Sequence, residues 1–143
     1  MKSGIEVSQD VRSLINIPEV LNNITGRIYL QVLPSTNSVN IVVACLAVTN
    51  QQLQNATVNV NIHCPMLSVD VEGSSPKRNT QVPDLKTFER VASLILPYLD
   101  SQWKDEFNTY VESPGVPIRD SDGSYFFNIR VRYRSFQSNY KNI

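Results

Sequence analysis

The sequence predicts an α+β fold with a single, mainly antiparallel β-sheet, one main helix packed on it and a short N-terminal helix. Residues 56–64 alternate between apolar and polar side chains, which is typical of a strand with one dry face. The helix expected from Asp84 to Leu96 carries apolar residues at three- and four-residue spacing, which form one stripe. A strand face and a helix stripe of this kind bury each other. The predicted dry face and stripe consist of Val58, Val60, Ile62, Cys64, Leu85, Phe88, Ala92, Ile95 and Leu99.

Length and composition indicate one domain over residues 1–143. A chain of 143 residues suits a single domain, and its 41% hydrophobic content is ordinary for a globular protein. The 13 basic and 13 acidic residues cancel, which argues against a dedicated nucleic-acid binder, because such a domain shows a basic excess. No apolar run approaches the roughly 20 residues that span a bilayer, so no membrane partner is expected.

The first residues and the cysteines indicate the compartment expected for the protein. The first residues lack the apolar segment of a signal peptide. Two cysteines are too few for a disulfide framework, which favours a reducing compartment. The polar tail at 137–143 is expected to be flexible.

The N-terminal part predicts two helical segments. The first is capped by Ser3 or Ser8 and ends before Pro18, because the residue before a proline avoids the helical region. Pro18 opens a short second turn, which Gly26 closes.

Three strands are expected next. Residues 27–32 alternate, as a half-buried strand does. Residues 39–48 are apolar at almost every position, which indicates a central strand buried on both faces. The alternating strand at 56–64 follows a polar connection.

Residues 65–83 form a long loop or arm. The stretch from Gly73 to Asn79 has loop composition, although apolar residues before it alternate as a strand would. Loops this long in compact domains are usually functional or disordered. Two interpretations stay open: a floppy surface loop, and an arm that is mobile in the isolated protein and orders on a partner by adding a strand to it. The interface residues expected here are Leu67, Val69, Val71, Lys77 and Arg78.

The C-terminal half predicts the main helix and two further strands. Asp84 is a good N-cap, and Pro97 is expected to end or kink the helix, with Trp103 in a looser turn beyond it. Residues 107–112 and 124–136 are expected to be strands around a loop, with Asp122 and Gly123 in the tight reversal.

The last strand carries a row of cations on one face: Arg130, Arg132 and Arg134. Three arginines on one strand face can meet phosphates. In a second interpretation, they form a solvated face or a row of ion pairs between subunits. The neutral charge of the whole chain favours the second interpretation.

The residues that could carry catalysis do not form a recognisable site. His63 is the single histidine, and it neighbours Cys64 on a strand, so the two side chains point to opposite faces and cannot form a dyad. Cys45 with His63 stays open as a remote hydrolase pair, against the plainer interpretation of a buried small thiol. One histidine and two distant cysteines do not supply a structural zinc site. We therefore expect no enzyme activity, cofactor or metal.

Three stretches, in this order, resemble the tail-completion (tail terminator) family of tailed bacteriophages. The first runs from Ile17-Pro18-Glu19-Val20-Leu21 to Thr25-Gly26-Arg27-Ile28-Tyr29. The second is the alternating strand that ends at Cys64, with the helix around Phe88 to Leu96. The third comprises Glu112-Ser113, Arg119-Asp120-Ser121-Asp122-Gly123 and Arg130-Val131-Arg132-Tyr133-Arg134. They span most of the chain, and their order and spacing carry the resemblance.

The resemblance implies a structural virion protein of the tail or neck, assembled in the host cytoplasm. Members form a ring, usually six-fold, that stops growth of the tail tube and joins tail to head without catalysis. The implied partners are other copies of this chain, the tail tube protein and the head connector or stopper protein. DNA would pass through the channel without sequence-specific binding. Two alternatives stay open: another head–tail adaptor of a short-tailed phage, and a small cellular module that binds protein or nucleic acid.

Overall fold

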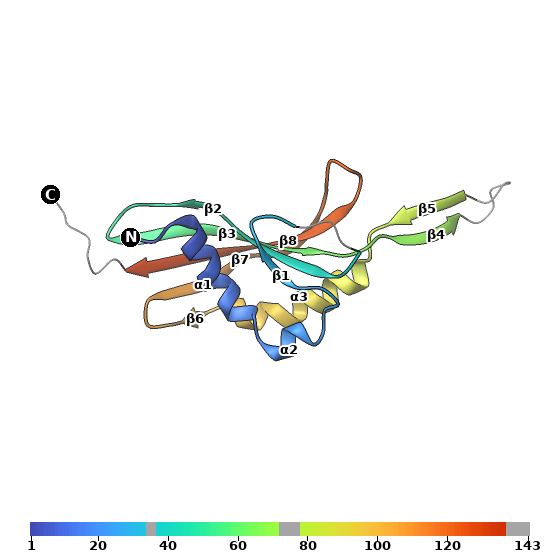
Figure 1. Cartoon of the computed structure of the whole chain (residues 1–143). Helices are drawn as coiled ribbons and strands as arrows, with labels where there is room; N and C mark the ends of the chain where they lie inside the picture. Colours follow the sequence, from blue (N-terminus) through green and yellow to red (C-terminus); the bar gives the residue numbers. More distant parts are fainter. Residues whose placement is uncertain (34–36, 72–77, 137–143) are drawn as a thin grey trace.

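The computed structural model describes residues 1–33, 37–71 and 78–136 and has an α+β fold built on a six-stranded sheet (Figure 1). The strand order is β1-β2-β3-β8-β7-β6; β1 and β2 are parallel, and the other neighbours are antiparallel. A separate antiparallel pair joins β4 and β5. The elements are α1 (Gly4–Ile15), α2 (Pro18–Leu21), β1 (Ile28–Leu30), β2 (Asn40–Val48), β3 (Leu53–His63), β4 (Leu67–Val71), β5 (Arg78–Val82), α3 (Leu85–Leu99), β6 (Gln102–Trp103), β7 (Phe107–Arg119) and β8 (Tyr125–Phe136).

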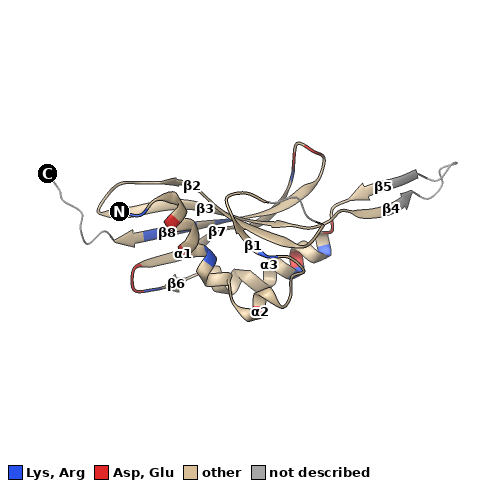
Figure 2. Cartoon of the chain, in the orientation of Figure 1, with Lys and Arg blue, Asp and Glu red and all other residues tan. Residues whose placement is uncertain are grey.

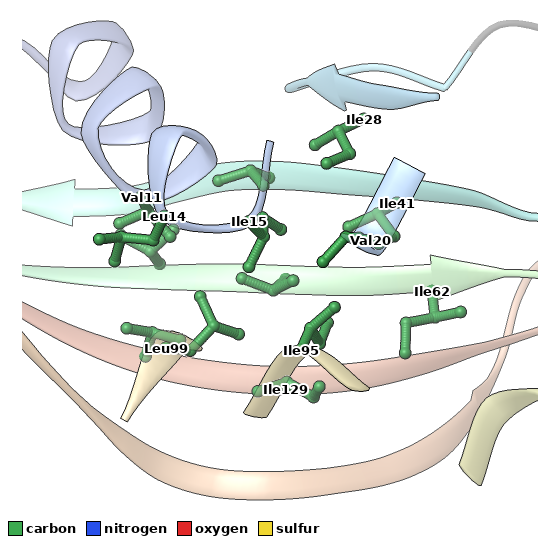
Figure 3. Packing of buried hydrophobic residues seen from close by; sticks show 14 of the residues in the cluster. Val11, Leu14, Ile15, Val20, Ile28, Ile41, Ile62, Ile95, Leu99 and Ile129 are labelled. Atoms are coloured by element: carbon green, nitrogen blue, oxygen red, sulfur yellow. The ribbon is translucent and has the colours of Figure 1, made fainter. Parts of the chain in front are cut away.

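The helices lie on one face of the six-stranded sheet, and the core lies between (Figures 1 and 3). Val58, Val60 and Ile62 of β3 are fully buried against α1 and α3, because alternate residues of a strand share one face. The predicted fold class is confirmed. The opposite face of the sheet carries no described helix, and we call it the open face.

The apolar stripe of α3 differs from the predicted one at its first residue. Leu85 is 56% exposed, because it begins the helix and has no preceding turn to pack beneath it. Val91 is fully buried in the stripe instead. Phe88, Ala92, Ile95 and Leu99 are buried as expected.

Both long helices begin at the predicted caps. The Ser3 hydroxyl accepts from the backbone N–H of Glu6, whose side chain accepts from the Ser3 N–H in return, so α1 starts with a capping box. The Asp84 side chain accepts from Thr87 N–H at the start of α3. Pro97 was expected to end or kink the helix, and an end there is wrong, because α3 continues to Leu99. Burial of Leu99 in the core holds this last turn, although a proline inside a helix removes one hydrogen bond.

Two strands differ in extent or burial from the prediction. β2 is buried over residues 40–43, whereas Leu46 in its second half is exposed, so two-sided burial applies to the first half alone. β7 runs on to Arg119 through a stretch that contains Pro114 and Pro117. Pro114 lies in one of two irregularities in the pairing with β8, and Pro117 lies on the part of β7 that β6 does not pair, since prolines are tolerated at bulges and sheet edges. The predicted reversal before β8 is confirmed, with Gly123 at φ 87°.

The segment expected as a loop or arm contains a β-hairpin. β4 and β5 pair from Leu67 opposite Val82 to Val71 opposite Arg78. This hairpin, which we call the arm, extends beyond the end of the six-stranded sheet and leads into α3 (Figure 1). Alternation of apolar residues in β4 was the signal for a strand. Residues 72–77 and the tail at 137–143 lie outside the described residues.

Candidate interaction surfaces

The arm exposes apolar side chains on one face. Leu67 is 46% exposed and Val69 is 45% exposed, and two residues apart on a strand they share a face. A two-stranded hairpin is at best marginally stable alone in water, so exposed apolar residues on it point to a partner. The backbones of Val71 and Arg78 are paired in the register of the two strands, and Lys77 lies outside the described residues.

The arginine row lies on the open face of the sheet. Residues directly opposite in an antiparallel pair share a face, and Thr57 of β3 pairs with Arg132 of β8. Alternation along β8 then places Arg130 and Arg134 on the same face, as the sequence predicted. The side chains on the other face of β8, such as Val131, are buried in the core.

The three arginines have different surroundings. Arg132 Nε lies 3.2 Å from Glu112 Oε1, and its guanidinium also donates to Thr57 Oγ1 at 3.1 Å. The Arg134 guanidinium lies 5.8 Å from the centre of the Tyr110 ring, a cation–π distance. Among the described residues, neither Arg130 nor Arg134 forms an ion pair. These two cations are therefore available to an external partner.

An aromatic cluster on the same face was missed by sequence reasoning. Trp103, expected in a loose turn, is 79% exposed on β6, and its register through Asn108 to Arg134 places it on the open face. Phe136 is 64% exposed and lies directly opposite the exposed Leu53. We call this surface the aromatic patch; it consists of Leu53, Trp103, Tyr110, Arg134 and Phe136. Tryptophan, tyrosine and arginine are the residues that dominate protein–protein hot spots.

Sequence signals for the aromatic patch were weak because its members come from four strands. Only Arg134 and Phe136 are close in sequence, at the two-residue spacing that places them on one face. The positions of Trp103 and Leu53 follow from the strand order and the register of the sheet. Neither the order nor the register can be read from local patterns in one sequence.

The centre of the open face holds paired amides. Asn128 donates to the side-chain oxygen of Asn61 at 2.7 Å. The side-chain oxygen of Asn59, directly opposite Arg130, is buried and has no hydrogen-bond partner among the described residues. An unsatisfied buried acceptor is costly, so this site favours a donor supplied by a partner or by a reoriented arginine.

At the other end of the sheet, an open cleft of about 540 Å³ borders the root of the arm. Its lining includes His63, Cys64 and the turn residues Asp120 and Asp122. Burial lowers the pKa of His63, and this effect exceeds that of the two negatively charged aspartates, which raise it. Burial also raises the pKa of the Cys64 thiol to about 12, so this sulfur is protonated, and a poor nucleophile, at neutral pH.

The remote pairing of Cys45 with His63 is excluded by the strand register. Cys45 lies opposite Val58, five residues from His63 along β3. Five residues of strand place the two side chains roughly 17 Å apart. Within the described ranges, no three histidine, cysteine or acidic side chains gather as metal ligands do.

No protein-family model matches this chain, and no curated protein sequence matches it. None of the described helices has the length and apolar character needed to cross a membrane. The functional argument therefore starts from the arm, the arginine row and the aromatic patch.

Proposed function

We propose that this chain is a structural virion protein that forms a ring at the head–tail junction of a tailed phage. In this role it terminates the tail tube and joins it to the head connector. The resemblance of three ordered sequence stretches to the tail-completion family suggests this role. The observation that carries the proposal is the projecting arm, because its exposed Leu67 and Val69 need a partner surface.

Ring geometry agrees with the distribution of exposed surfaces. A ring uses heterologous contacts, so each subunit must present two different surfaces that fit each other. The arm is one candidate, and the open face is another. The remaining surfaces of such a ring would contact the tail tube on one side and the head connector on the other.

The neutral charge of the chain supports passage of DNA without sequence-specific binding. An adaptor of a short-tailed phage would have the same subunit contacts but no tail tube to cap. Binding to purified tail tubes therefore separates the two roles.

Electron microscopy of the purified protein, alone and mixed with phage tails, tests the proposal. We expect closed rings in solution and a ring on the end of each tail tube. A phage that encodes the double variant Leu67→Ser, Val69→Ser is expected to accumulate separate heads and tails. A wild-type protein that stays monomeric at high concentration and beside tail tubes would rule the proposal out.

A further inference from the structure

We propose that the arm of one copy of this chain docks on the aromatic patch of the next copy. This inference rests on the proposed ring and assigns its subunit contact. The donor is the face of β4 that carries Leu67 and Val69. The acceptor is the aromatic patch on the open face of the neighbouring subunit.

The two surfaces lie at opposite ends of one strand, so they cannot meet within a single chain. Leu53 of the patch is the first residue of β3, and the arm starts four residues after β3 ends at His63. An eleven-residue strand is on the order of 35 Å long. Figure 1 shows the arm at the end of the sheet away from the C-terminus of β8. Contact between them must therefore join two copies, and in the proposed ring it runs head to tail.

The surfaces match in apolar character. Leu67 and Val69 present aliphatic side chains, and Trp103 and Phe136 present broad rings that no described residue covers. In typical interfaces a few residues supply most of the binding energy, and tryptophan, tyrosine and arginine are enriched among them.

Individual charged residues near the arm and on the open face could also pair between copies. The turn between β7 and β8 carries Asp120 and Asp122, with Arg119 beside them, and it lines the same cleft as the root of the arm. On the open face, Arg134 in the patch and Arg130 near the middle of β8 have no described ion-pair partner. Figure 2 shows acidic residues in the β7–β8 turn and a basic residue near the far end of β8, where the turn between β6 and β7 also carries acidic residues. Head-to-tail docking brings the acidic turn toward the arginine row of the next subunit.

Docking on the face is favoured over strand addition at an edge. The outer edge of β7 contains Pro114 and Pro117, which lack the N–H groups that a new strand would need. The other edge is formed by β1, which has only three residues, and beyond it by the second half of β2. This part of β2 has an irregularity after Cys45, whose N–H already donates to the Ser8 hydroxyl at 3.0 Å. Short or interrupted edge strands disfavour the addition of a further strand, so the aromatic patch is the better acceptor.

A complementation experiment tests the contact with the full chain. The arm variant is Leu67→Ser with Val69→Ser, and the patch variant is Trp103→Ser with Phe136→Ser. All four side chains are exposed, so melting temperatures are expected to stay near that of wild type. Ile5→Ser is the matched control, because Ile5 is 59% exposed but lies on α1, in the helical layer.

Each double variant alone is expected to weaken self-association at least about 30-fold in sedimentation velocity, whereas the control assembles as wild type. A mixture of the two variants retains one intact arm and one intact patch. It should form a 1:1 species with twice the 16.2 kDa chain mass and nothing larger. Identical patches meeting each other would not produce that species.

A charge-reversal pair tests the orientation independently. Asp120→Lys with Asp122→Lys, and Arg130→Glu with Arg134→Glu, should each weaken assembly, and all four changes together should restore it. The contact is wrong, while the ring stands, in either of two cases. In the first, wild type forms rings and the arm and patch variants both assemble normally. In the second, wild type forms rings and the mixture of the arm and patch variants yields no dimer. Wild-type protein that never self-associates overturns both. Patch variants that form rings yet fail to bind tail tubes would assign the patch to the tube and overturn the contact.

Discussion

Truncation of Phe88 to alanine tests the packing of α3 on the sheet. Phe88 is 1% exposed, and its ring stacks on Phe127 of β8 with centroids 5.7 Å apart and planes at 24°. Removing a buried phenylalanine ring costs about 3–5 kcal/mol of unfolding free energy, from lost burial and from the cavity left behind. A domain of this size loses roughly 2–4 °C of melting temperature per kcal/mol, so a drop of about 10 °C is expected.

The assay is thermal and urea unfolding followed by circular dichroism at fixed protein concentration. Leu85→Ala is the matched control, because Leu85 lies in the same helix but is 56% exposed, and it should change the unfolding free energy by less than about 0.5 kcal/mol. A Phe88→Ala protein that melts within a degree or two of wild type would show that the helix does not pack on the sheet as described.

Three further predictions concern ionisable groups. Burial lowers the pKa of His63 in the folded protein below the usual 6.5, so the unfolded chain binds the proton more readily. The free energy of unfolding should therefore fall as the pH drops through about 6.5. In urea titrations between pH 7 and pH 5, the His63→Gln variant should lose less of this free energy than wild type does. The raised pKa of Cys64 should make its alkylation by iodoacetamide at pH 8 much slower in the folded protein than in urea, and equal rates would contradict its burial. Wild type should show no specific DNA affinity, and the triple arginine-to-glutamate variant at 130, 132 and 134 should disturb assembly instead; a salt-steep, sub-micromolar DNA-binding curve for wild type would contradict this.

Elements with a strong local period were predictable from the sequence. The alternation in β3 and the stripe of α3 each identify a buried face without reference to the rest of the chain. The caps Ser3 and Asp84 were likewise predictable, because a side-chain acceptor at a helix start acts on N–H groups two or three residues away.

Elements decided by tertiary contacts were not predictable. The glycine and prolines of β7 indicate a loop locally, yet pairing with β8 keeps the segment extended. The helix runs past Pro97 because Leu99 is buried by distant residues. The aromatic patch depends on strand order, since the register places Leu53 opposite Phe136 and Trp103 in the same row as Arg134, with Asn108 between them. Local sequence patterns were therefore enough to predict the core. The proposed interaction surface could be recognised only once the strand order and register of the sheet were known.

The root of the arm bears on whether a head-to-tail contact closes into a ring. A repeated heterologous contact gives a ring if its rotation closes and an open filament if it does not, so the angle between arm and sheet must be well defined. Pro65 precedes β4 and Pro83 follows β5, and a proline ring restricts the backbone φ to about −65°. Asp84 then caps α3, which packs on the core, directly after the second proline. The arm is thus bounded by stiff backbone on both strands, so a repeated contact through it has one defined rotation, which the proposed closed ring requires.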